Sequence, residues 1–125
     1  MLKSINIISI ALSISILAAC GGGGSDGAIY GSIAVNTATR AGGITARQNS
    51  QAEANSAAIG QCGIGCATVV EFVGASQCGA LARGIDGAMG WTNGYPQANA
   101  EMVAKTACTQ RGGILCAVQL SMCNS

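Results

Sequence analysis

The 125-residue sequence contains no histidine, one proline, one tryptophan, one phenylalanine and two tyrosines. Without histidine, Ser-His and Cys-His nucleophilic dyads and histidine-ligated metal sites are excluded. Because large side chains are scarce while 50% of the residues are hydrophobic, the core must be packed from small side chains. Charge is also scarce: without Lys3, five of the six basic residues remain to face five acidic ones. No basic cluster supports nucleic-acid binding, and electrostatic steering by the whole molecule is expected to be weak.

The first twenty residues have the pattern of a bacterial lipoprotein signal peptide. Lys3 supplies a positive charge, and the apolar run Ile5 to Ile16 is too short for a membrane span of roughly 20 residues. Leu17-Ala18-Ala19-Cys20 then resembles a lipobox, where the peptide is cut before a cysteine that carries diacylglycerol. We therefore expect residues 1–19 to be removed and Cys20 to be lipidated. An ordinary secretory signal is the alternative that the small residues alone leave open.

Cysteine parity favours lipidation of Cys20. The chain has seven cysteines, and an odd number in an oxidising compartment normally means a free thiol or an intermolecular bridge. Once Cys20 is set aside, the remaining cysteines can all pair: Cys62, Cys66, Cys78, Cys108, Cys116 and Cys123. Residues 20–125 then suit one small domain that supplements a thin core with disulfides.

Residues 20–27 predict a glycine-rich tether between Cys20 and the domain. The seven residues after Cys20 have an r.m.s. length of very roughly 15 Å, which keeps the domain close to the bilayer. Gly21, rather than aspartate, after the lipidated cysteine resembles sorting to the outer membrane. We therefore expect a lipid-anchored protein of the cell envelope, in the outer membrane and facing the periplasm.

Residues 28–125 repeat one pattern. A shift of 46 residues aligns five identical residues within Ser50 to Cys62 and the segment 96–108. Each copy, at about 28–77 and 78–125, has the order strand, glycine-rich loop, helix, cysteine, short loop, cysteine, strand. The sequence therefore predicts a small α/β (α+β) domain, built as a tandem pseudo-twofold repeat and stapled by disulfides.

Apolar periodicity places the individual elements. Ala28 to Val35 alternates as a strand does, with Gly79 to Ile85 as its weaker counterpart. Ser50 and Glu53 form a capping box that starts a helix ending at Cys62. In the last strand of each copy, every second residue is apolar or threonine: Thr68, Val70, Phe72, Val118, Leu120 and Met122. These residues are in phase with Cys66 and Cys116, and we expect them to face the helices.

That phase favours two local disulfides, Cys62–Cys66 and Cys108–Cys116. Cys78 and Cys123 are left, and as equivalents in the repeat they are expected to meet across the pseudo-twofold axis. Six cysteines permit 15 connectivities, and this scheme is one of them. A Cys62–Cys78 bridge would contradict it. The alternative is a zinc site with four thiolate ligands: Cys62, Cys66, Cys108 and Cys116. Oxidation of these cysteines outside the cytoplasm disfavours it. No metal or cofactor is expected.

These features resemble the bacterial family known as domain of unknown function 4189. The resemblance covers about residues 28–125 and implies export and this repeated fold, but no particular activity. Copy one has Ile44-Thr45 where the family tends to place an aromatic residue. The segments that carry the resemblance are Tyr30-Gly31-Ser32-Ile33-Ala34, Gln51-Ala52-Glu53-Ala54 to Cys62, Cys78-Gly79-Ala80-Leu81-Ala82, Gly90-Trp91 and Ala100 to Cys108.

The stretch from Asp86 to Pro96 is a candidate contact loop. It combines glycines with Met89, Trp91 and Tyr95, residue types enriched among interface anchors. The alternative, which the shortage of large residues favours, is that Trp91 fills the core.

Catalysis is not expected, because a hydrolase would have to draw its carboxylates from Glu71, Asp86 and Glu101. The ordinary role of Glu71 and Glu101 is a solvated or paired surface charge. We expect a non-enzymatic lipoprotein that binds and blocks a periplasmic protein, as an immunity or inhibitor protein against a toxin does. An envelope structural or assembly module is the second possibility, and a small hydrolase the third. The expected contacts are an unidentified periplasmic protein and the membrane, through the lipid anchor, but no nucleic acid.

Overall fold

The computed structural model describes residues 29–125. The predicted signal peptide, Cys20 and the tether of residues 20–27 lie outside the described residues. Within residues 29–125, no helix has the length and apolar character that crossing a membrane requires.

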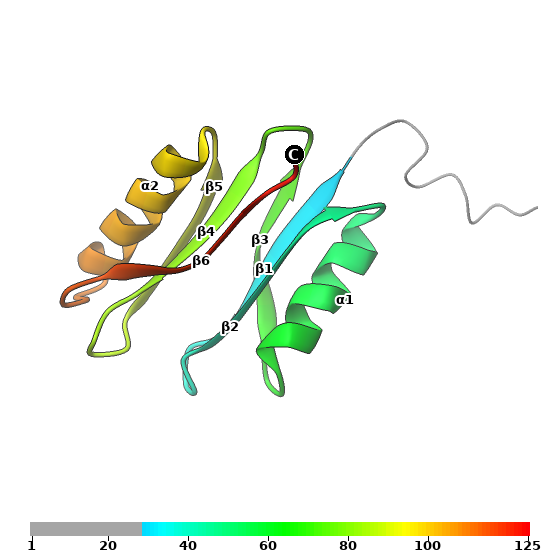
Figure 1. Cartoon of the computed structure of the whole chain (residues 1–125). Coiled ribbons are helices and arrows are strands. Elements are labelled where there is room, and N and C mark those ends of the chain that lie inside the picture. Colours follow the sequence, from blue (N-terminus) through cyan, green and yellow to red (C-terminus); the bar gives the residue numbers. More distant parts are fainter. Residues whose placement is uncertain (1–28) are drawn as a thin grey trace, which may run out of the picture.

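The domain consists of two copies of a β-β-α-β unit (Figure 1). This confirms the predicted α+β repeat. Copy one comprises β1 (Tyr30–Asn36), β2 (Ala41–Gln48), α1 (Gln51–Cys62) and β3 (Ala67–Val73). Copy two comprises β4 (Cys78–Arg83), β5 (Met89–Gly94), α2 (Gln97–Gln110) and β6 (Ala117–Cys123).

Strands β2 and β5 occupy segments that the sequence predicted to be glycine-rich loops, so this prediction is wrong. Their glycines serve helix packing. A Cβ on Gly43 would overlap the carbonyl oxygen of Ala58 in α1, and a Cβ on Gly90 would overlap the backbone of Cys108 in α2. Each helix thus lies directly on the backbone of a strand, which only glycine permits at these positions.

The strands form two antiparallel sheets that pack face to face. The strand orders are β2-β1-β3 and β5-β4-β6. Helix α1 covers the outer face of the first sheet and α2 that of the second, so the layers run helix, sheet, sheet, helix (Figure 1). Between the sheets, β2 contacts β6 and β3 contacts β5. A pseudo-twofold axis that exchanges β2 with β5 and β3 with β6 accounts for both contacts.

The inner core lies between the sheets and uses residues of both copies. Phe72 is its largest fully buried side chain. The Phe72 ring occupies the space that a side chain on Gly31 or Gly79 would need, so one aromatic residue spans the two central strands. The buried members of this inner core are Ile33, Val35, Ile44, Ala46, Val70, Phe72, Leu81 and Met89.

A bulge in each closing strand reverses the side-chain direction that the sequence predicted. The pairing of β3 with β1 steps from Val70 to Thr68 and skips Val69, and β6 skips Gln119 in the same way. A bulge of one residue shifts the alternation to the other face. Val70 and Phe72 therefore face the opposite sheet, and the prediction that they face α1 is wrong.

Candidate functional site

All six cysteines of the described domain form disulfides, in the pairs Cys62–Cys66, Cys78–Cys123 and Cys108–Cys116. The alternative zinc site therefore has no free thiolate. Cys78 lies opposite Cys123 in the pairing of β4 with β6, with 3.9 Å between their Cα atoms. Both belong to copy two, so the expectation that this bridge crosses the pseudo-twofold axis is wrong. Its counterpart in copy one is Tyr30 opposite Val73.

Four connections gather at one end of the sandwich, which we call the loop end. They are residues 37–40, 63–66, 84–88 and 111–116, at the lower edge of Figure 1. Asn36 Nδ2 donates to the Ile64 carbonyl (3.2 Å), Arg40 packs on Gly87, and Ile85 N–H donates to the Ile114 carbonyl (2.9 Å). These contacts join the four connections into one surface. The opposite end, where residue 29 enters and the chain finishes, is called the tether end.

The loop end exposes four aliphatic side chains: Ile64 (100% exposed), Leu115 (77%), Ile85 (71%) and Ile114 (55%). Ile64 lies between the paired Cys62 and Cys66, and Ile114 and Leu115 lie between the paired Cys108 and Cys116. None of these four residues was predicted from the sequence. For Ile64, Ile114 and Leu115, the available signal was an aliphatic residue inside a short loop that a disulfide closes.

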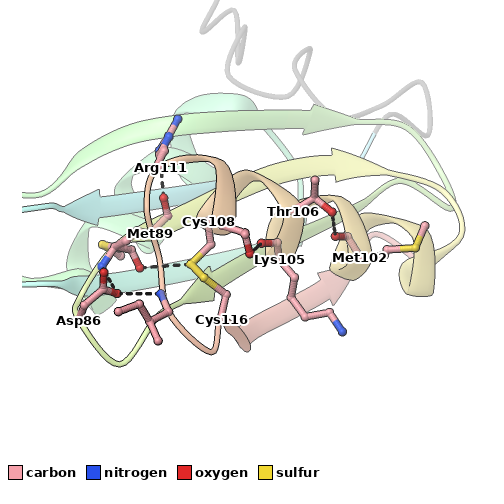
Figure 2. Close-up of a disulfide and its surroundings, with 11 residues drawn as sticks. Asp86, Met89, Met102, Lys105, Thr106, Cys108, Arg111 and Cys116 are labelled. Atoms are coloured by element: carbon pink, nitrogen blue, oxygen red, sulfur yellow. Dashed lines mark hydrogen bonds between the residues drawn. A yellow bond between two sulfur atoms is a disulfide. The ribbon is translucent and has the colours of Figure 1, made fainter.

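Hydrogen bonds and a disulfide fix the larger of these loops (Figure 2). The Asp86 carboxylate accepts from the backbone N–H of Ile114 (3.2 Å) and of Ala88 (3.4 Å), which ties residues 84–88 to residues 111–116. Leu115 has φ of +50°, a left-handed conformation that costs a branched residue roughly 1–2 kcal/mol. The adjacent Cys116, bonded to Cys108, holds the chain in this conformation. Leu115 is therefore displayed in a fixed position and is not free to collapse onto the domain.

Three basic residues also lie at or near the loop end. Arg40 and Arg111 are exposed, and Arg83, the last residue of β4, is partly buried. The Nε of Arg83 is buried without a hydrogen-bond partner among the described residues. The guanidinium of Arg111 lies 3.9 Å from the centroid of the Trp91 ring, and its Nη1 donates to the Met89 carbonyl (Figure 2). The loop end thus combines apolar contact area with guanidinium donors, which is a combination suited to binding.

Residues 30–123 match a family described as "Domain of unknown function (DUF4189)". This chain belongs to that family. The matched segment begins with the first residue of β1 and ends with the last residue of β6, so it contains both copies of the repeat. Neither the curated proteins nor the solved structures contain a significant match.

In this DUF4189 domain, the stretch predicted as a contact loop is mostly strand β5. Met89 is 4% exposed and belongs to the inner core, which corrects its prediction as a partner-binding residue. Trp91 is partly buried and packs against the same core beneath Arg111, which supports the alternative of a core role. Ile44 takes the corresponding place in copy one, where it is opposite Ile33 as Trp91 is opposite Leu81. Tyr95, beyond β5, remains exposed.

The DUF4189 fold does not bring Glu71 and Glu101 together. Glu71 is opposite Ser32 in the pairing of β1 with β3, on the face of the first sheet that α1 covers. The predicted phase, in which Thr68, Val70 and Phe72 face the helices, puts Glu71 on the opposite face, and this placement is wrong. Glu101 lies on α2, in the layer at the other side of the sandwich. Two carboxylates in separate layers do not flank one cleft, as glycoside hydrolysis requires.

Proposed function

We propose that this chain is a non-enzymatic envelope lipoprotein that binds a periplasmic protein through the loop end, as an immunity or inhibitor protein does. One observation carries the proposal: four exposed aliphatic residues are displayed at one end, three of them inside disulfide-closed loops. Clustered apolar exposure on a small soluble domain marks an interaction surface. Loops that are already rigid lose little conformational entropy on binding, which favours affinity.

The direction of the chain supports a partner away from the membrane. Residue 29 lies at the tether end, and β1 runs from there to the loop end over seven residues, or about 23 Å. Lipidation of Cys20 therefore anchors the domain by the end opposite the exposed aliphatic residues. The loop end then points into the periplasm, where a protein partner is accessible.

The test compares two double variants in the native host. Ile114→Ser with Leu115→Ser removes apolar contact area at the loop end, and Met102→Ser with Val103→Ser removes exposed apolar area on α2. Partner recovery by affinity purification from envelope extracts should fall at least tenfold for the first variant and stay within twofold for the second. Cells carrying the first variant should also lose protection against the toxin of a neighbouring gene. Equal recovery from both variants would overturn the proposal.

Lipidation is tested separately. Mass spectrometry of the native protein should show a chain that begins at Cys20 and carries a diacylglycerol. A Cys20→Ala variant should leave the membrane fraction while its domain still folds. Recovery of the protein as a fixed component of a large envelope assembly would favour the structural alternative.

A further inference from the structure

We propose that the loop end docks onto an acidic protein surface that contains an apolar pocket. This inference rests on the proposed binding function and adds the chemistry of the partner. Guanidinium groups would pair with carboxylates of the partner, and Leu115 with Ile114 would enter the pocket between them. The distribution of charge along the strands supports such a partner.

The charged side chains of residues 29–125 are separated along the long axis of the sandwich. The half near the loop end holds four bases and one acid, a net charge of +3: Arg40, Arg83, Lys105, Arg111 and Asp86. The half near the tether end holds three acids and one base, a net charge of −2: Glu53, Glu71, Glu101 and Arg47. The sequence order mixes the two signs, so this separation exists only in the folded chain.

The one acid at the loop end, Asp86, offsets only one of the four positive charges there. The Asp86 carboxylate is engaged by the backbone N–H groups of Ala88 and Ile114. The guanidinium of Arg111 is directed by the Trp91 ring, and Arg40 packs on Gly87 of the other copy. Positioned guanidinium groups form strong, bidentate hydrogen bonds with carboxylates. The loop end is therefore preorganised for a carboxylate-bearing partner.

Apolar and charged groups have different roles in this surface. Leu115 and Ile114 supply the area that is removed from water, as the central anchors of an interface do. The arginines at the loop end raise the rate of encounter with an acidic partner, because opposite charges attract. They also disfavour a basic partner, because like charges repel. An anionic bilayer also offers negative charge and apolar volume. The anchor at the opposite end argues against it, because the loop end points away from the membrane that holds Cys20.

The experiment uses photo-crosslinking in living cells with the full-length, lipidated protein. A photo-reactive amino acid replaces Leu115 in one strain and Met102, which is exposed on α2, in another. Each is combined with Arg40→Glu or Arg47→Glu. The two arginines form a matched pair: both are exposed, both belong to copy one, and both have positive φ, at 66° and 60°. Only Arg40 lies at the loop end.

Adducts from position 115 should contain a protein, and the crosslinked peptide should map next to Asp or Glu residues on that protein. Arg40→Glu should reduce the adduct yield about tenfold, whereas Arg47→Glu should leave it within about twofold. Adducts to lipid from position 115, a crosslinked surface that is basic, or equal yields for the two arginine variants would each overturn the inference.

The two position strains separate this inference from the function on which it rests. Protein adducts from position 102 with none from position 115 would refute docking at the loop end and leave a protein-binding function standing. No protein adduct from either position would refute both.

Discussion

The side chain of Asn124 joins the two copies at the tether end. It is 2% exposed although it is the penultimate residue. Its Nδ2 donates to the carbonyl oxygens of Ile29 (3.1 Å), Gly74 (3.1 Å) and Phe72 (3.4 Å), and its Oδ1 accepts from Arg47 N–H (3.0 Å). One amide thus ties the end of β3, the end of β2 and the entry of β1 to the last strand.

Replacing Asn124 by alanine should lower the free energy of unfolding by about 3 kcal/mol, because buried backbone groups lose their partners. Urea denaturation measures the change. Asn99→Ala, at an exposed asparagine of α2, is the control and should change the free energy by about 0.5 kcal/mol at most. Equal stability of the two variants would show that Asn124 has no such role.

Ser32 presents the opposite case, a buried hydroxyl without a partner. Ser32 is 0% exposed, and no hydrogen bond to its Oγ exists among the described residues. Ala80 occupies the same register position in copy two, opposite Thr92 as Ser32 is opposite Thr45. The neighbouring Thr45 does use its hydroxyl, which donates to the Ala54 carbonyl at 2.8 Å.

Ser32→Ala should therefore raise the free energy of unfolding by up to about 1 kcal/mol, since alanine buries no unsatisfied group. Thr45→Val, which removes a hydroxyl that is in use, should lower it by about 1 kcal/mol. Chemical denaturation of both variants provides the comparison. A loss of stability in Ser32→Ala would show that the Ser32 hydroxyl has a hydrogen-bond partner in the folded protein.

At the level of elements, glycine has two distinct roles. Gly90 in β5 lies against the backbone of α2, with no room for a Cβ, whereas the region around Gly60 in α1 is open within 4 Å. A methyl group at position 90 would push helix and sheet apart. At position 60 it would only reduce the conformational freedom of the unfolded chain.

Gly90→Ala should lower the melting temperature, with a loss of at least about 2 kcal/mol from the strained packing. Gly60→Ala should raise the free energy of unfolding by about 0.5–1 kcal/mol, as expected for alanine in an exposed helix interior. Calorimetry distinguishes the two. A neutral Gly90→Ala variant would mean that α2 shifts on its sheet without cost.

The disulfides also differ in how much they stabilise the folded domain. Cys78–Cys123 has a sequence separation of 45 residues, and Cys62–Cys66 a separation of 4. In the chain-entropy model, replacing both cysteines by alanine should cost about 4 kcal/mol for the first pair and about 2 kcal/mol for the second. Guanidinium denaturation of the two double variants measures this order.

The Cys62–Cys66 variant should instead show its main effect in binding, because it frees the loop that carries Ile64. If removing Cys62–Cys66 costs more stability than removing Cys78–Cys123, the loop-length argument fails for this domain.

For the whole molecule, the inner core is shared. Buried side chains of β1, β2 and β3 pack against those of β4 and β5 between the sheets. Neither copy covers the inner face of its own sheet. Each copy is therefore a repeat of the sequence and of the symmetry, but the two copies are expected to fold only together.

A chain of residues 29–77 alone should not fold, since Ile33, Ile44 and Phe72 would lose the sheet that covers them. The same holds for residues 78–125. Circular dichroism and NMR of each half, beside the complete domain, test this expectation. A monomeric half with dispersed amide signals and a cooperative unfolding transition would contradict it.

Part of this organisation was predictable from local pattern. The helix N-cap at Ser50 forms as predicted, with the Ser50 hydroxyl accepting from Glu53 N–H (3.1 Å), because capping involves neighbours in the chain. The helices and the first strand of each copy follow from periodicity. Strands β2 and β5 do not, because their glycines are indistinguishable in sequence from those of a loop.

The side-chain directions in β3 and β6 could not be predicted from the sequence for a related reason. No residue type signals the bulges at Val69 and Gln119. One skipped residue moves each later side chain of the strand to the other face of the sheet. The role of Asn124 depends on contacts with residues 50 or more positions away. Sequence patterns within a single strand or helix do not contain that information.

By itself, the sequence determined the repeat, the bounds of α1 and the two local disulfides, because each depends on spacing along the chain. Tertiary structure alone decided which faces the strands present, that Met89 is buried, and that Ile64, Ile85, Ile114 and Leu115 meet at one end. It also converted a nearly neutral chain into a domain with a basic end and an acidic end. Both results follow from the pseudo-twofold packing, which lays equivalent loops side by side and sums charges that are distant in sequence.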